Sequence, residues 1–291
     1  MNKYNVLRAM TRDGSARVTV INSTDIVNEA AKCHHPAPTS LAALGRALTA
    51  TSMMGAMLKE KEDTLTLRIF GDGACGAIVA VSDYMGNVRG YMQNPDADLP
   101  VRSDGKLDVR GVVGKGELCV TREFGGGAPQ SGTVKIVSGE IAEDICSYFA
   151  TSEQTPTECA LGVLVDTDGT CLAAGGLMIQ LLPFADDATV EKIEANAPKI
   201  SNISSLVSKG LTNSEILALA LDGVEYDEFD DFTAEYKCRC QRDNFKGAIA
   251  SFSKKELDEL FAGDETIETC CKFCGKKYSF SKAEIYGAKN K

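Results

Sequence analysis

The 291-residue sequence lacks any long apolar run. A membrane-spanning helix needs about 20 consecutive apolar residues, and no stretch approaches that length. The first residues, Met1-Asn2-Lys3-Tyr4-Asn5, precede no apolar segment of the kind that a signal peptide carries. We therefore expect a soluble, cytoplasmic protein with no membrane partner.

Histidine is scarce, with only His34 and His35 in the whole chain. Adjacent side chains point apart, so these two are expected to be ordinary core or surface residues and not a second metal site. No motif places a serine or cysteine nucleophile beside either histidine, which leaves a hydrolase triad unsupported. We find no catalytic constellation and expect no enzyme.

Basic residues are also too few for a protein whose main partner is nucleic acid. The net charge is −10, and phosphate binding relies on a basic surface. The charge is uneven: residues 231–291 carry 12 Lys and Arg against 10 Asp and Glu, a balance of +2, so residues 1–230 carry −12. The acidic body and the slightly basic tail could attract each other.

Eleven cysteines are present, and in an unexported chain they are expected to be reduced or bound to metal because the cytosol disfavours structural disulfides. Six are scattered singly, and free cysteine is among the most buried residue types. We expect these six to be small buried hydrophobes: Cys33, Cys75, Cys119, Cys146, Cys159 and Cys171.

The pattern of residues 1–183 is typical of an α+β domain with a mainly antiparallel sheet packed with helices. Arg12-Asp13-Gly14 predicts a hairpin turn, and residues 40–58, apolar nearly all round, predict a buried helix packed against a sheet. Further helices are expected from about Asp25 and over 140–149. The remaining alternating runs predict strands over 64–70, 77–82, 88–93, 117–121, 133–137, 162–165 and 171–179.

Residues 184–230 form a helical and acidic linker region in this reading. Apolar residues three or four apart predict short amphipathic helices, and Thr212 to Glu215 is a capping box that opens one of them. The run from Asp222 to Asp231 is acidic and lacks periodicity, which favours a linker.

Four cysteines in the last part of the chain predict a metal centre. Cys238 and Cys240 form C-x-C, and Cys271 and Cys274 form C-x-x-C after a 30-residue gap. Two short pairs supply four thiolates to one tetrahedral ion, as in a four-cysteine zinc site. Within such a site we expect the nearest sulfurs to be sequence neighbours.

Residues 231–291 are therefore expected to be a small zinc-binding domain holding one Zn²⁺. Such a domain has too little apolar material for a core of its own, so losing the ion should unfold it. Capping boxes at Ser253 and Ser281 predict short helices. Basic side chains near the sulfurs would offset the charge of a four-thiolate centre: Lys237, Arg239, Lys272, Lys276 and Lys277. Cys270 is an extra thiol, read as an incidental exposed residue or else as a source of mispairing or an alternative ligand.

Two other functions fit parts of this pattern. A zinc ribbon could contact RNA or another protein through the nearby lysines, and Cys271 with Cys274 could serve a thiol-disulfide oxidoreductase. The acidic body disfavours the first, and a C-x-x-C in a short tail disfavours the second. Gly71-Asp72-Gly73-Ala74-Cys75-Gly76 matches G-x-G-x-x-G, but a strand-like run follows it where a dinucleotide site needs a helix, so we expect a hairpin turn.

The whole chain resembles the redox-regulated 33 kDa chaperonins, the heat shock protein 33 family. The spacing of the two cysteine pairs and the run Cys271 to Phe280 carry the resemblance. The other matching motifs are Ala43 to Arg46, Gln93 to Pro95, Val137 to Asp144, Ser152 to Pro156, Ala174 to Gly176 and Ile179 to Pro183.

The resemblance implies an ATP-independent chaperone, or holdase, that binds unfolding proteins during oxidative stress and acts as a homodimer. It implies that the reduced, zinc-bound form is inactive, and that oxidation forms Cys238–Cys240 and Cys271–Cys274 disulfides and releases zinc. Because both disulfides would be local, they could not replace the link that the metal makes between the two pairs.

The residue pattern suggests where such a protein would bind clients. We expect the metal-held tail to cover the amphipathic segment 187–221, whose apolar face is then exposed when the tail unfolds. The candidate client-binding residues are Val190, Ile193, Ile203, Leu206, Val207, Ile216 and Leu217.

Overall fold

The computed structural model describes residues 5–289, without the side chains of residues 230, 231 and 289. Residues 1–4, on which most of the expectation about a signal peptide rests, therefore lie outside the described residues. The chain divides into two compact units, the first ending at Lys237 and the second running from Cys238. Within residues 5–289, no helix combines the length and the apolar character that crossing a membrane requires.

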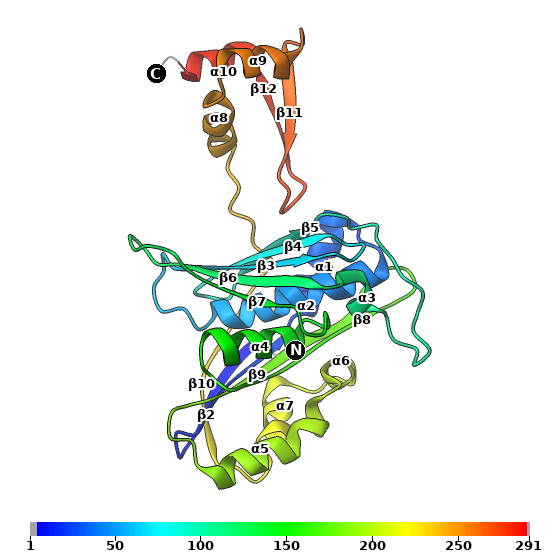
Figure 1. Ribbon diagram of the computed structural model, residues 1–291, viewed down its shortest axis with the longest axis vertical. Coiled ribbons are helices and arrows are strands. Elements are labelled where there is room, and N and C mark those ends of the chain that lie inside the picture. The colour runs from blue at the N-terminus through cyan, green and yellow to red at the C-terminus, as the bar shows by residue number, and fades with distance from the viewer. Residues whose placement is uncertain (1–4, 290–291) are drawn as a thin grey trace. The chain divides into compact units, whose positions relative to one another are not determined.

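The first unit alternates sheets and helices in four layers, which Figure 1 shows as two sheets with helices between them and on one outer face. One sheet has the order β5-β4-β3-β6-β7 and the other β10-β1-β2-β9-β8, and neighbouring strands pair antiparallel throughout. The α+β class with antiparallel sheets is thus confirmed.

The strand bounds follow the predicted alternating runs to within a few residues, apart from β8, which begins five residues earlier, and β10, which was not predicted as a strand. The first sheet contains β3 (Thr64–Gly71), β4 (Ala77–Asp83), β5 (Val88–Met92), β6 (Gly116–Glu123) and β7 (Gln130–Lys135). The second contains β1 (Val6–Thr11), β2 (Ala16–Asn22), β8 (Thr157–Val165), β9 (Cys171–Leu181) and β10 (Tyr226–Phe232). The helices of this part are α1 (Thr24–His34), α2 (Pro38–Gly55), the short α3 (Val109–Val113) and α4 (Ala142–Ser152).

Helix α2 lies between the two sheets, which explains why its sequence is apolar on every side. Leu44 and Leu48 are fully buried in one core with Leu67 of β3 on one side and Met178 of β9 on the other. Burial of each such leucine contributes roughly 1.5–3 kcal/mol. The prediction of a buried helix against a sheet is confirmed, with a second sheet on its opposite side.

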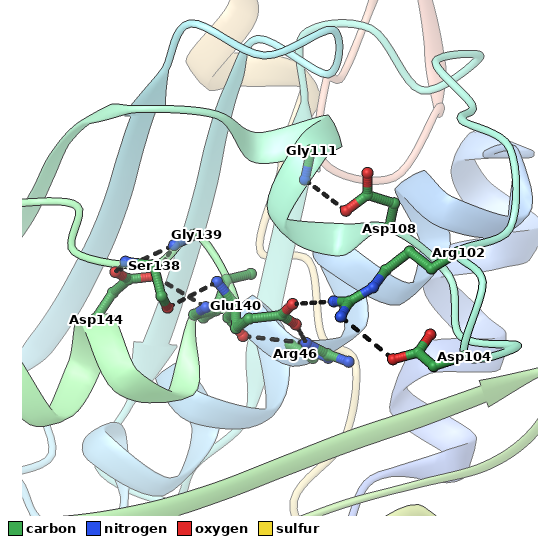
Figure 2. A network of polar contacts seen from close by, with 10 residues as sticks. Arg46, Arg102, Asp104, Asp108, Gly111, Ser138, Gly139, Glu140 and Asp144 are labelled. Atoms are coloured by element: carbon green, nitrogen blue, oxygen red, sulfur yellow. Dashed lines mark hydrogen bonds and ion pairs between the residues drawn. The ribbon is translucent and has the colours of Figure 1, made fainter.

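Helix α4 is fixed at its start by the Asp144 carboxylate, which accepts backbone N–H groups from the preceding loop (Figure 2). Val137, Ser138, Gly139 and Ile141 donate at 2.8, 2.9, 3.0 and 2.9 Å. The bond from Ile141, the residue that caps the helix, satisfies a donor that a helix start leaves without a partner, and the other three fix the preceding loop. Together the four bonds also hold Ile141 in the left-handed region, at φ 71°.

Glu140, in the same loop, ties this corner to α2. Its carboxylate lies 2.6 Å from the Arg46 guanidinium and 3.1 Å from that of Arg102, as the dashed lines in Figure 2 trace. The motifs 43–46 and 137–144, which carry part of the resemblance described above, therefore meet in one ion-pair network.

Three helices cover the outer face of the second sheet: α5 (Asp187–Ile200), α6 (Ile203–Ser208) and α7 (Asn213–Ala220). The prediction of short amphipathic helices is confirmed, and Thr212 with Glu215 forms the expected capping box. Their apolar face packs in one cluster with Val18, Val20 and Leu177 of the sheet. The expectation that the tail covers this face is wrong, because the sheet of the same unit already buries it.

The acidic run after α7 is a strand and not the linker expected from its composition. β10 pairs with β1, with a register shift between Leu7 and Ala9. A bulge of this kind turns the strand, and accordingly Tyr226 packs with the α5–α7 cluster while Phe232 packs with the main core. The residues 184–230 therefore belong to the first unit.

The chain after β10 stays hydrogen-bonded to the rest of the first unit as far as Lys237, where that unit ends. Ala234 exchanges two hydrogen bonds with the Asn5 side chain, at 2.9 and 2.8 Å, and the Lys237 N–H donates to the Val88 carbonyl at 2.8 Å. This pairs residues 235–237 with the edge of β5. The unit boundary lies after Lys237, whereas the sequence reading placed it at 230.

The second unit has five elements: α8 (Arg242–Ala250), α9 (Lys254–Phe261), β11 (Thr266–Cys270), β12 (Lys277–Ser281) and α10 (Lys282–Lys289). Ser253 and Glu256 form the predicted capping box, and Ser281 accepts the Glu284 N–H at 3.2 Å. The core is small, as the composition suggested, and consists of Ile249, Leu257, Phe261, Tyr278, Phe280 and Ile285.

Candidate metal centre

Cys271 and Cys274 lie in the tight turn between β11 and β12. The Cys271 N–H donates to the Lys276 carbonyl at 2.9 Å, and the Gly275 N–H donates back to the Cys271 carbonyl at 2.9 Å. Gly275 has φ 69°, a conformation that favours glycine. This turn presents both sulfurs on the same side, as a two-thiolate half of a metal site requires.

Cys238 and Cys240, the first residues of the unit, bring the other two sulfurs to this turn. All four sulfurs lie within 4.8 Å of one another. The Cys238 and Cys271 sulfurs are 3.7 Å apart, and those of Cys240 and Cys274 are 3.5 Å apart. Zn–S bonds of about 2.3 Å in a tetrahedron place sulfurs about 3.8 Å apart, so the four cysteines fit this ion.

The 3.7 and 3.5 Å contacts each join one residue of C-x-C to one of C-x-x-C, so the two pairs face each other. The expectation that sequence neighbours are nearest stays a prediction.

Without a cation these thiols would not all ionise together. Burial raises the pKa of Cys238 to about 11 and raises the pKa of Cys274 further still. Burial also acts to raise the pKa of Cys240, but hydrogen bonds from Tyr278 and the neighbouring thiols outweigh it, and that pKa falls to about 7. A divalent metal is the kind of ligand that stabilises four crowded thiolates.

The sequence reading missed Tyr278 as a residue of the site. Its hydroxyl lies 3.1 Å from the Cys240 sulfur and 3.3 Å from the Cys240 carbonyl oxygen. Its ring packs against Phe245, with centroids 5.0 Å apart. The one sequence signal for this role is that Tyr278 lies four residues after Cys274. In β12, the alternation of side chains turns that position toward the core of the unit.

The basic residues near the sulfurs have specific partners. Lys276 lies over the Tyr278 ring, 5.4 Å from its centroid, and Lys277 forms a 2.9 Å ion pair with Glu268 across the hairpin. The Glu268 carboxylate thus offsets part of the positive charge of Lys277, which weakens the electrostatic stabilisation that Lys277 gives to the thiolates.

Cys270 lies outside the cluster of four. Its thiol is exposed and contacts the Gly275 carbonyl oxygen at 3.2 Å. Of the six single cysteines, Cys75 and Cys171 are buried as expected, whereas the other four are only half-buried. Burial raises the pKa of Cys75 to about 11, which keeps that thiol protonated.

Two other sequence motifs have simple structural roles. The glycine run 71–76 ends in Gly76 at φ 64° and is followed by strand β4, which confirms a turn and not a dinucleotide site. His34 places its Nε2 3.1 Å from the Tyr236 hydroxyl. The Cys271–Cys274 turn connects two strands, whereas redox-active C-x-x-C cysteines are activated at a helix N-terminus.

The fold and the cysteine cluster together define a two-unit protein with four cysteines placed to hold a metal ion, and comparison with known proteins gives its family. The family model described as "Hsp33 protein" matches residues 5–281. The chain is 42% identical to the 33 kDa chaperonin of Clostridium botulinum (strain 657 / Type Ba4), covering 97% of this chain and 96% of that protein. The 33 kDa chaperonin of Clostridium acetobutylicum is also 42% identical, over 96% of this chain and 95% of its own length.

A solved structure agrees with these relatives. The crystal structure of the 33 kDa chaperonin (heat shock protein 33 homolog) from Thermotoga maritima superposes with a TM-score of 0.89, at 34% identity, covering 99% of this chain and 98% of that one. The chain belongs to the Hsp33 family. This membership supports a chaperone role and bears out the resemblance inferred from the cysteine spacing.

Proposed function

We propose that this protein is a redox-regulated, ATP-independent holdase, inactive when reduced and zinc-bound and active after oxidation. The observation that carries the proposal is the cluster of four sulfurs within 4.8 Å in a unit with a core of only six buried residues. A unit of this size is marginal without a cross-link. Its order would therefore depend on ligands that an oxidant can remove.

Cys238, Cys240, Cys271 and Cys274 would hold one Zn²⁺. When bound, the ion supplies a link between residues 238–240 and the β11–β12 turn, and in small zinc modules such binding is worth roughly 10–16 kcal/mol of folding free energy. Tyr278 would donate its O–H to the Cys240 thiolate, holding that ligand in place.

Oxidation would convert the two ligand pairs into Cys238–Cys240 and Cys271–Cys274 disulfides. Each S–S bond forms from two thiols and one peroxide, with two molecules of water as the other product. Neither bond joins 238–240 to the turn, so the second unit would lose its cross-link and unfold.

Client proteins would bind the apolar face of α5–α7. Ile193, Ile203, Ile216 and Leu217 are 3% exposed or less, and Val207 is 8% exposed, so this face becomes available only if the helices leave the sheet. Val190 and Leu206 are half-buried at its margin. The chain from α7 runs through β10 and 235–237 directly into Cys238, which gives unfolding of the second unit a covalent route to these helices.

The remaining parts of the proposal are cytoplasmic residence, a homodimeric active form, no catalytic activity, and no nucleic-acid or membrane partner. The net charge of −10 is compatible with the absence of nucleic-acid binding. Tight, salt-sensitive RNA binding by the reduced protein would contradict this part.

The experiment compares reduced, zinc-loaded protein with protein treated with peroxide at mildly elevated temperature. We expect oxidation to release one zinc per chain. The oxidised protein should then suppress the aggregation of a chemically unfolded client without ATP. A Cys240→Ser, Cys274→Ser double variant is the control for metal dependence, and it should hold clients without oxidation. Zinc release without gain of holdase activity would refute the proposal.

A further inference from the structure

A cleft of about 760 Å³ opens in the first unit where α2 ends between the two sheets. Clefts that hold small molecules measure about 300–1,000 Å³. Its apolar lining includes Met54, Met57, Leu58, Phe124 and Phe149. Met54 and Phe149 are 1% and 2% exposed, so the deeper wall is built from core side chains, and Phe124 lies half-buried at the end of β6.

Arg17 of β2, an exposed residue, places a positive charge on this cleft, whose lining also includes the basic residues Lys59 and Arg122. Its Nε donates at 2.9 Å to Oε1 of Gln180, the residue directly opposite on β9, which is an uncharged acceptor. Among the described residues, no carboxylate forms an ion pair with Arg17. Its pKa is lowered, because burial disfavours the charge and because the like charge of Arg122 is close.

Four carboxylates also line the cleft; Glu153 and Asp63 have other partners, whereas Glu60 and Glu62 add negative charge to it. Glu153 accepts from Arg122 at 2.9 Å and from the Tyr148 hydroxyl at 2.5 Å, so both of its oxygens are used. Asp63 accepts backbone N–H groups of Glu60 and Gly125 at 3.2 and 3.3 Å. The guanidinium of Arg17 therefore keeps hydrogen-bonding capacity, beside the apolar side chains of the cleft, that an anion could fill.

We propose that this cleft binds a free long-chain carboxylate, with its head group on Arg17 and its alkyl chain against Met54, Leu58 and Phe124. A carboxylate is the planar anion that an arginine fork recognises in two bonds, and an alkyl chain suits the apolar wall. The proposal does not rest on the redox function, because every residue of the cleft lies in the first unit.

The test is calorimetric titration of the full-length, reduced, zinc-loaded protein with dodecanoate below its micelle-forming concentration. We expect one saturable site per chain. Octanoate should bind about tenfold more weakly or worse, since each methylene left unburied reduces affinity. Dodecanol, which lacks the charge, should also lose about tenfold. Dodecyltrimethylammonium, whose charge is opposite, should not bind.

Two variants locate the site. Arg17→Met keeps an apolar stem and should weaken dodecanoate binding at least about tenfold, because it removes both charge-assisted hydrogen bonds to the carboxylate. Arg12→Met is the matched control, because Arg12 lies in the β1–β2 turn and pairs with Asp227 and Glu225. Phe124→Ala provides an independent variant should Arg17→Met fail to fold, and it should weaken dodecanoate more than octanoate.

Three results would overturn the proposal. One is the absence of saturable dodecanoate binding to the wild-type protein. Another is equal affinity in the Arg17→Met and Arg12→Met variants. The third is Arg17-dependent binding of an unfolded apolar peptide with no binding of dodecanoate, which would assign the cleft to client side chains.

Discussion

The hydroxyl of Tyr278 lies 3.1 Å from the sulfur of Cys240. The same tyrosine is 7% exposed and belongs to the small core of the second unit. The hydrogen bond with Cys240 is the main reason that the pKa of Tyr278 is raised to about 12, so the phenol stays a donor at neutral pH. One residue thus connects Cys240, a proposed metal ligand, to the core that the metal is proposed to stabilise.

Replacing Tyr278 with phenylalanine should weaken zinc binding while keeping the ring in the core. Loss of a hydrogen bond to a metal ligand reduces affinity about tenfold to a hundredfold. Competition with a chromophoric chelator measures the affinity. Tyr286→Phe is the matched control, since the Tyr286 hydroxyl bonds to Asp258 and not to a sulfur. Equal affinities in the two variants would show that the contact with Cys240 plays no part.

Replacing Cys270 with serine should leave zinc content at one ion per chain, because its thiol points to the Gly275 carbonyl and lies outside the four-sulfur cluster. Replacing the adjacent Cys271 should remove a ligand and with it most of the bound zinc. Elemental analysis of the two purified variants separates these outcomes. Loss of zinc in Cys270→Ser would mean that Cys270 exchanges with Cys271 as a ligand.

Replacing Gly162 with alanine should push α6 off the second sheet. A Cβ at Gly162 would come within 2.7 Å of the Ser204 backbone nitrogen, and overpacking of this kind costs about 1–3 kcal/mol. If α5–α7 carry the client surface, the reduced, zinc-loaded variant should already suppress client aggregation. Gly247→Ala, where a Cβ meets nothing within 4 Å, is the control. A variant whose α6 amides lose hydrogen-exchange protection without gaining client binding would exclude these helices as the surface.

The attachment of α5 should depend on pH through Asp13. Its carboxylate accepts from the Ser15 and Thr189 hydroxyls at 2.7 Å each, and its pKa is held well below the ordinary 3.8 by hydrogen bonds from Thr11, Ser15 and Thr189. A lowered folded-state pKa stabilises the fold above the ordinary value, and this contribution is lost as pH falls toward the folded-state value.

The test is the difference in unfolding free energy between wild type and Asp13→Asn. It should be constant above about pH 5 and shrink progressively below the ordinary value. Asp168→Asn, in the β8–β9 turn, removes a comparable turn carboxylate that is bonded to the Thr170 N–H of its own turn. A difference that stays constant down to pH 3, or one that grows, would show that Asp13 is not ionised as described.

Local signals in the sequence predicted much of this fold. Asp13-Gly14 marked the first hairpin, the capping boxes at Thr212 and Ser253 marked helix starts, and the cysteine spacing marked the cluster of four sulfurs. Each of these depends on residues a few positions apart, whose hydrogen bonds form whatever the rest of the chain does.

The features that the sequence left open depend on distant partners. β10 looked like an acidic linker because its strand character comes from pairing with β1, more than 200 residues earlier. The helices α5–α7 were expected under the tail because an apolar face does not specify which surface will bury it. Arg17 gave no signal, since a single arginine in a strand is ordinary until the fold places a cleft beside it.

The coupling of zinc to the order of residues 238–289 is the central claim, and hydrogen exchange with parallel zinc measurement tests it most directly. Upon peroxide treatment, we predict loss of one zinc per chain together with loss of amide protection in β11, β12 and α8, at the same rate as client binding appears. The sheets of the first unit should keep their protection. Oxidised, zinc-free protein whose second unit remains fully protected would contradict the account, as would client binding that appears while zinc is still bound.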